Sequence, residues 1–148
     1  MTAIFVLRHA DRAVGADSLS DAGKRRAQSL AGMLADTGVS VAYCSDARRT
    51  YETLAPLKQR LGDSLTIHEV SAADPGGTNA HVQSVVAAIK ALPSDTVAVA
   101  VSHSNTVRQI IEGLGGGSDA KIAETEFDKL FLLVRCADGQ NTLLRLHY

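Results

Sequence analysis

The chain has few of the residues that mark unusual structural classes. It holds two cysteines, three prolines and no tryptophan in 148 residues, so it has neither a disulfide framework nor a proline-rich linker. Fifteen lysine and arginine residues almost balance sixteen aspartate and glutamate residues, and the net charge is −1. We therefore expect no nucleic-acid partner and no membrane partner, because the chain as a whole has no basic field.

Long apolar runs are also missing. The start of the chain has no basic region, and the run from Ile4 to Leu7 is too short to cross a bilayer. We therefore expect a cytoplasmic protein with reduced thiols, in which Cys44 and Cys136 are buried at the end of one strand and inside another. Hydrophobic residues make up 45% of the chain, and its length fits a single domain, residues 1–148.

Apolar segments of strand length alternate with segments of helical period. Strands are expected at residues 3–7, 41–44, 65–70, 96–101, 130–136 and 143–147. Helices are expected after Ser20, after a cap at Ser45 or Asp46, from Thr78 or Asn79, and from Thr106. The expected fold class is therefore α/β: a three-layer sandwich with a mostly parallel central sheet flanked by helices. The most apolar strand, 96–101, is expected at the centre, and the last two strands as an antiparallel hairpin.

Two histidines lie where buried strands are expected to end. His9 follows the first strand and His103 follows the strand at 96–101, while the strand at 41–44 leads to Arg48 and Arg49. The carboxyl ends of parallel strands form the crevice in which open α/β sheets bind ligands, so these side chains can meet. Histidines and arginines gathered there are suited to binding and transferring phosphate.

Four short segments resemble motifs of the histidine phosphatase superfamily, the phosphoglycerate-mutase-like proteins. Residues 8–10, Arg-His-Ala, are similar to its Arg-His-Gly signature, and residues 19–23, Leu-Ser-Asp-Ala-Gly, resemble its Leu-Thr-x-x-Gly helix start. Residues 45–53 resemble a Ser-Pro-x-x-Arg-Ala-x-x-Thr segment, and residues 102–106 resemble the second-histidine motif. The segments occur in family order, and with the C-terminal hairpin the resemblance covers nearly the whole chain.

The resemblance implies a metal-independent phosphatase that forms a phosphohistidine intermediate on His9. In the family segment the phosphate-binding arginine lies four residues before the threonine, which selects Arg49 and leaves Arg48 as a surface charge. Arg8 and Arg49 present planar sets of donors that match phosphoryl oxygens, and His103 adds a further donor. Nearby guanidinium groups would disfavour the protonated form of His9 and keep a lone pair for attack. We expect neither a cofactor nor a metal.

The remaining candidates are less sharply defined. The resemblance implies that a carboxylic acid in the segment after the third strand protonates the leaving oxygen. Glu69 is slightly favoured over Asp74 for this role, and a phosphoramidate substrate needs neither. Arg12 is either a further phosphate ligand, as in the acid-phosphatase branch, or a partner in a loop salt bridge. Three histidines outside the motifs are expected in surface or packing roles: His68, His81 and His147.

A small phosphorylated molecule or a phosphoprotein is the expected substrate. A phosphoglycerate-type mutase is a weaker alternative, because 148 residues leave little chain for a lid that excludes water. A non-catalytic phosphate-binding module on the same fold is another alternative, but the intact set of Arg8, His9, Arg49 and His103 argues against it. A metallohydrolase would need carboxylates interleaved with histidines, and only Asp11 lies near His9.

Overall fold

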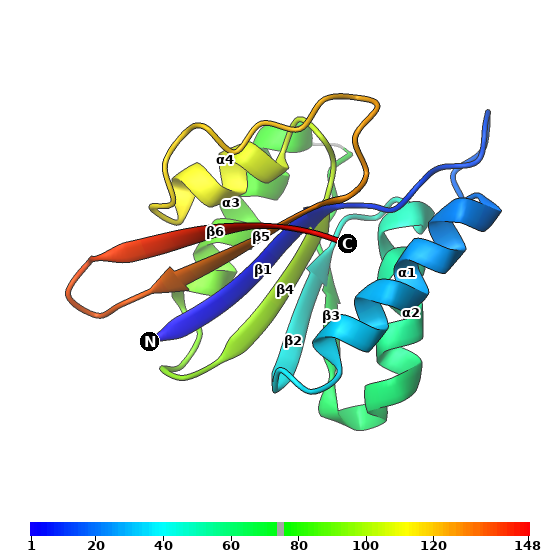
Figure 1. Cartoon of the computed structure of the whole chain (residues 1–148). Helices are drawn as coiled ribbons and strands as arrows, with labels where there is room; N and C mark the ends of the chain where they lie inside the picture. The colour runs from blue at the N-terminus through cyan, green and yellow to red at the C-terminus, as the bar shows by residue number, and fades with distance from the viewer. Residues whose placement is uncertain (74–75) are drawn as a thin grey trace.

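The chain folds into a central sheet with helices on both faces (Figure 1). The computed structural model describes residues 1–73 and 76–148. The strands are β1 (Thr2–Arg8), β2 (Val39–Cys44), β3 (Thr66–Glu69), β4 (Val97–Ser102), β5 (Lys129–Arg135) and β6 (Asn141–His147). The helices are α1 (Asp21–Leu34), α2 (Arg48–Leu61), α3 (Gly77–Lys90), α4 (Val107–Gly113) and a short 3-10 turn, Gly62–Ser64. The predicted α/β class and the order of its elements are confirmed.

The sheet is parallel except at its C-terminal edge. Its strand order is β3-β2-β4-β1-β5-β6. Strands β3, β2, β4 and β1 run parallel, whereas β5 pairs antiparallel with β1 and β6 antiparallel with β5. The predicted hairpin is therefore present, and β4 lies between β2 and β1 as its apolar sequence predicts.

Two apolar clusters, one on each face of the sheet, hold the layers together. Ile4 and Val6 of β1 belong to the cluster with α3 and α4, whereas Phe5 and Leu7 belong to the cluster with α1 and α2. This division follows from the alternation of side chains along a strand. Strand β1 is thus buried on both faces, and it delivers His9 from a fixed support.

The motif at residues 19–23 packs the chain after His9 against α1. Ser20 caps the helix as predicted, because its Oγ accepts a hydrogen bond from the backbone N of Gly23 at 3.1 Å. A Cβ on Gly23 would lie 2.1 Å from the carbonyl oxygen of Asp11, so only glycine fits there. The motif therefore fixes the path of the loop that leaves the first histidine.

The predicted cap of α2 is wrong. Neither Ser45 nor Asp46 caps this helix; Ala47 precedes its first residue and offers no capping side chain. The carboxylate of Asp17, from the loop before α1, accepts hydrogen bonds from the backbone N of Arg48 at 3.0 Å and of Arg49 at 3.4 Å. A cap supplied by a loop 31 residues away leaves no local pattern in the sequence.

Three smaller points complete the comparison with the sequence. Cys44 is buried as predicted, but Cys136 lies just after β5 and is partly exposed, because the strand ends one residue earlier. Both cysteines are free thiols. Helix α3 begins at Gly77, one residue before its predicted start. Within the described residues, every helix is too short or too polar to cross a membrane.

Candidate active site

A cavity of about 470 Å³ lies at the carboxyl ends of the parallel strands. Its lining comes mainly from the segments after β1, β2 and β4: Arg8, His9, Arg12, Arg49, Ala72, Thr78, His103, Ser104, Asn105 and Glu124. The structure thus brings together both motif histidines and the three arginines proposed for phosphate from the sequence. The rings of His9 and His103 are 5.5 Å apart between centroids, in a T-shaped arrangement.

His9 presents a neutral imidazole with a defined tautomer. Its backbone N donates to the carbonyl oxygen of Ser102 at 2.9 Å, which joins the ends of β1 and β4. Its Nδ1 lies 2.8 Å from the carbonyl oxygen of Ala10. Because a carbonyl only accepts, the proton is on Nδ1 and the lone pair is on Nε2.

Burial is the main reason why His9 stays unprotonated. The side chain is 3% exposed, and desolvation lowers its pKa from 6.5 to about 4, with smaller contributions from Arg8, Arg49 and His103. The sequence predicts the direction of this shift but assigns it to the guanidinium groups alone. At neutral pH the ring keeps the lone pair that a nucleophile needs.

Thr53 explains the threonine at the end of the third motif. Its Oγ1 accepts a hydrogen bond from the backbone N of Ala10 at 2.9 Å and donates one to the carbonyl oxygen of Arg49 at 2.8 Å. The first turns of α2 are thereby fastened beside His9. Ala10, which stands where the family motif has glycine, is completely buried against Leu19.

His103 is held on both sides of its ring. Its Nε2 lies 2.9 Å from Ser45 Oγ, and its Nδ1 lies 3.4 Å from Nη2 of Arg49. A guanidinium only donates, so Nδ1 accepts and Nε2 carries the proton. Burial first and Arg49 second lower its pKa from 6.5 to about 4. His103 is therefore also uncharged at neutral pH.

The segment before β5 immobilises Arg8. Nη1 of Arg8 donates to the carbonyl oxygens of Ala123 (3.4 Å), Glu124 (2.7 Å) and Glu126 (3.0 Å). Its guanidinium lies 4.0 Å above the ring of Phe127, a cation–π contact. Burial lowers the pKa of Arg8, and the Glu124 carboxylate opposes that shift. An arginine remains charged in such surroundings, so Arg8 gives the cavity a fixed positive charge.

Arg49 and Arg48 lie in different surroundings. Arg49 lines the cavity, and its Nη1 donates to Asp17 Oδ1 at 2.7 Å. The Arg48 side chain is 73% exposed and pairs with Glu52 on the surface of α2. Asp17 therefore has two roles, because one carboxylate both caps α2 and holds its cavity-lining arginine. Sequence reasoning missed this residue, since it lies in a loop with no periodic pattern.

Among the described residues, Arg12 contacts a backbone carbonyl rather than forming the expected loop salt bridge, and its phosphate-binding role stays a prediction. It lines the cavity, while its Nε donates to the carbonyl oxygen of Ala16 at 2.6 Å within the same loop. That contact orients the side chain with one donor and leaves the rest of the guanidinium for a ligand.

The structure does not bring Glu69 to the cavity. This residue ends β3, the edge strand, and β2 and β4 separate β3 from β1. Its side chain is exposed and contributes, after burial, to raising the pKa of the Cys44 thiol to about 11. Asp74, the alternative, lies outside the described residues. Of the described residues that line the cavity, the one carboxylic acid is Glu124, which no sequence pattern indicated.

His81 has the packing role expected from the sequence. It is 1% exposed, with Nδ1 2.8 Å from the carbonyl oxygen of Val70 and Nε2 2.9 Å from Ser102 Oγ. Ser102 Oγ also forms a hydrogen bond with Thr106 Oγ1. Thr106 Oγ1 in turn accepts a hydrogen bond from the backbone N of His103 at 3.0 Å. The buried network supports the turn that carries His103.

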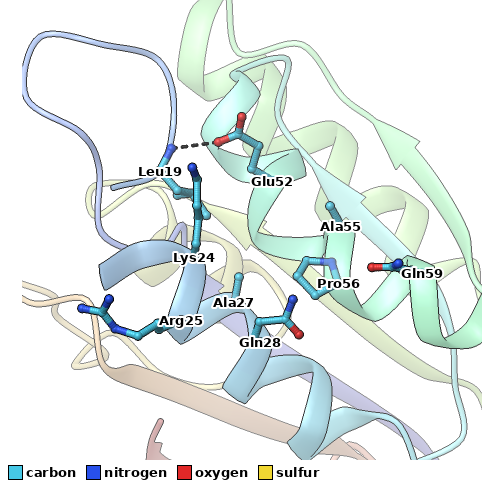
Figure 2. A pocket seen from close by; sticks show the side chains of 9 residues that line it. All are labelled: Leu19, Lys24, Arg25, Ala27, Gln28, Glu52, Ala55, Pro56 and Gln59. Carbon is cyan, nitrogen blue, oxygen red and sulfur yellow. Dashed lines mark hydrogen bonds between the residues drawn. The ribbon is translucent and has the colours of Figure 1, made fainter. Parts of the chain in front are cut away.

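A second cavity, of about 450 Å³, lies between α1 and α2 (Figure 2). Its lining includes no histidine: Leu19, Lys24, Arg25, Ala27, Gln28, Glu52, Ala55, Pro56 and Gln59. At its edge Glu52 Oε2 accepts from the backbone N of Leu19 at 2.8 Å, the dashed line in Figure 2. Glu52 thus holds the loop after His9 on α2 at a point separate from Asp17. Among residues 1–73 and 76–148, no three histidine, cysteine, aspartate or glutamate side chains gather as metal ligands.

Comparison with known proteins agrees with the motifs and the fold. The sequence model of the histidine phosphatase superfamily (branch 1) matches residues 4–72. No curated protein matches the chain in sequence. A proposed phosphohistidine phosphatase, SixA, from Agrobacterium tumefaciens has a similar structure, with a TM-score of 0.70 and 20% identity over 99% of this chain and 98% of that one.

Two further solved structures share the fold. The phosphoserine phosphatase of Entamoeba histolytica, in complex with 3-phosphoglyceric acid, aligns with a TM-score of 0.70 and 15% identity over 100% of this chain and 98% of that one. The phosphoglycerate mutase of Plasmodium falciparum aligns with a TM-score of 0.65 and 18% identity over 97% of this chain and 88% of that one. This protein thus resembles the histidine phosphatase superfamily in sequence over residues 4–72 and has the phosphoglycerate-mutase-like fold over its whole length.

Proposed function

We propose that the protein is a phosphatase that transfers a phosphoryl group from its substrate to His9 and then to water. The observation that carries the proposal is the tautomer of His9: its Nδ1–H donates to Ala10 and leaves the Nε2 lone pair in a cavity lined by arginines. A neutral imidazole among fixed cations is suited to attack an anionic phosphoryl group.

The first step uses groups of this chain. Nε2 of His9 attacks phosphorus, the bond between phosphorus and the leaving oxygen breaks, and that oxygen takes the electron pair and a proton. Arg8 and Arg49 stabilise the charge on the equatorial oxygens, which is the main contribution that a protein makes to phosphoryl transfer. Arg12 is the third cation of the cavity. Asp74 stays the candidate donor of that proton within the segment after β3.

The substrate that we propose is a small phosphorylated molecule or a phosphohistidine protein. The structural similarity to a proposed phosphohistidine phosphatase and to phosphatases of small phosphoesters supports this range. A panel of phosphoesters, phosphopeptides and a phosphohistidine protein would rank these classes by kcat/KM. Transfer from phosphoglycerate to its other hydroxyl, rather than to water, would instead indicate a mutase.

Quenching in an alkaline denaturant with ³²P-labelled substrate tests the covalent step. The parent protein should yield an acid-labile phosphoenzyme, because a phosphorus–nitrogen bond is broken by acid. His9→Ala should lose both the phosphoenzyme and turnover while unfolding at a similar urea concentration. Normal turnover by this variant would exclude His9 as the nucleophile, and activity should survive chelators.

The neighbouring residue, Arg48, provides a control for the proposed phosphate-binding role of Arg49. Arg49→Ala should lower kcat/KM by about 10²-fold or more, since it removes a donor to the transferring group. Arg48→Ala should change kcat/KM far less, because Arg48 is a surface residue paired with Glu52. Equal losses in steady-state assays of the two variants would show that the motif register selects the wrong arginine.

A further inference from the structure

Hydrolysis of a phosphohistidine requires a group that takes a proton from the attacking water. Glu124 is the one carboxylic acid among the described residues that line the cavity. Its side chain is 84% exposed, so it can return a proton to the solvent after each turnover. Its position in the irregular connection between α4 and β5 explains why the sequence gives no sign of it.

Two contacts fix Glu124 between the sides of the cavity. Ser104, the residue after His103, donates from its Oγ to Glu124 Oε1 at 2.8 Å. On the other side the backbone oxygen of Glu124 accepts from Arg8 Nη1 at 2.7 Å. Ser104 therefore contacts the carboxylate of Glu124, and Arg8 contacts its backbone.

The Glu124 carboxylate has a hydroxyl and a guanidinium as neighbours. The Ser104 hydroxyl donates to the carboxylate, and the Arg8 guanidinium lies beside it. Oε2 of Glu124 lies 3.6 Å from Nη2 of Arg8, which is longer than a hydrogen bond. A phosphoryl oxygen can therefore bind Nη2 without displacing Glu124 from Ser104.

We propose that Glu124 is the general base that activates water for hydrolysis of the phosphohistidine. The inference rests on the phosphatase function proposed above. In an in-line displacement, water attacks phosphorus from the side opposite Nε2 of His9. The water oxygen bonds to phosphorus, one of its protons passes to the Glu124 carboxylate, and the phosphorus–nitrogen bond breaks. The electron pair of that bond returns to Nε2, which leaves neutral His9, inorganic phosphate and a protonated Glu124.

The competing interpretation is that Glu124 only neutralises Arg8. Removal of a mere partner of Arg8 would change phosphate affinity and KM. Removal of a base would instead slow the second step and leave the first step unchanged. The two steps are separable with p-nitrophenyl phosphate, whose leaving group departs without a proton.

The experiment compares both steps in Glu124→Gln, which retains an acceptor for Ser104 and the backbone oxygen for Arg8. In stopped-flow measurements the burst of nitrophenolate should keep the rate of the parent within about threefold. Steady-state turnover should fall about 10²-fold, the usual contribution of a general base. Samples of the variant quenched in an alkaline denaturant should contain a larger fraction of phosphoenzyme than samples of the parent. Hydroxylamine, a stronger nucleophile than water, should restore much of the lost turnover.

Two further variants keep the result interpretable. Asp119→Asn removes a carboxylate from the same connection between α4 and β5. Asp119 pairs with Arg145 and does not line the cavity, so the kinetics of this variant should equal those of the parent. Ser104→Ala removes the donor to Glu124 and should slow the second step by a smaller factor. A Glu124→Gln protein with a changed KM but no phosphoenzyme accumulation would overturn the proposal. A parent protein that forms no phosphoenzyme would overturn the proposed function, and with it this step.

Discussion

The proton positions on His9 and His103 follow from single acceptor and donor atoms. The carbonyl oxygen of Ala10 fixes the proton of His9 on Nδ1, and Arg49 fixes the lone pair of His103 on Nδ1. The two rings therefore have opposite tautomers although they lie 5.5 Å apart. One ring offers a lone pair on Nε2, whereas the other holds a proton there.

Both histidines should titrate far below an ordinary histidine. Their pKa values are lowered from 6.5 to about 4, chiefly by burial, so both rings should stay neutral on acidification from pH 7 to pH 5. Inorganic phosphate should raise these pKa values, because an anion favours the protonated ring. Histidine NMR shifts followed against pH, with and without phosphate, measure both effects. An apparent pKa near 6 for either ring in the free protein would contradict the prediction.

At the scale of elements, the loop at residues 11–19 is fastened to α2 at two points. Asp17 accepts from the first backbone N–H groups of α2 and from the Arg49 side chain, and Glu52 accepts from the backbone N of Leu19. Of these two anchors, only Asp17 contacts a side chain that lines the cavity with His9 and His103, namely Arg49. The two anchors make a matched pair for mutation.

Asp17→Ala should impair catalysis more than Glu52→Ala. Both variants should lose about 1 kcal/mol of unfolding free energy, the usual value of a lost helix cap or similar hydrogen bond. Asp17→Ala should also lower kcat/KM at least about tenfold, since Arg49 loses the partner that orients it. Urea unfolding and steady-state assays separate the two effects. Equal catalytic losses would show that loop anchoring matters rather than the orientation of Arg49.

The sequence predicts best those parts of the site that depend on regular structure. His9 and His103 could be placed together because apolar strands show where the sheet ends, and Arg49 could be chosen because the family segment that it resembles has its phosphate-binding arginine four residues before the threonine. Asp17 and Glu124 could not be found, because irregular segments carry them and tertiary contacts alone place them. The resemblance favours Glu69 in the segment after the third strand, but that strand lies at the sheet edge, and sequence periodicity does not give strand order.

At the scale of the whole molecule, the site lies at one end of the central strands. Strands β1 and β4 pair over six residues from Ala3↔Val97 to Arg8↔Ser102, and the two apolar clusters cover them on both sides. His9 and His103 thus follow two paired strands that are buried in the core of the fold. Their desolvation is maintained only while that core stays folded.

The protein should therefore lose stability as the pH falls below about 6.5. In the unfolded chain His9 and His103 titrate near 6.5, but in the folded chain near 4. Between these values the unfolded chain binds more protons, so the free energy of unfolding decreases on acidification. Urea midpoints at pH 7 and pH 5 measure the loss, and His9→Gln should reduce it. An identical loss in the variant would show that other groups cause it.

The way Arg8 is held has a consequence for engineering. Its three acceptors at residues 123, 124 and 126 are backbone oxygens, which every amino acid supplies. The side chains at residues 123 and 126 can therefore be randomised without removing an acceptor from Arg8, provided that the backbone keeps its path. A library at these two positions should therefore keep the activity of the parent protein, because neither side chain lines the cavity.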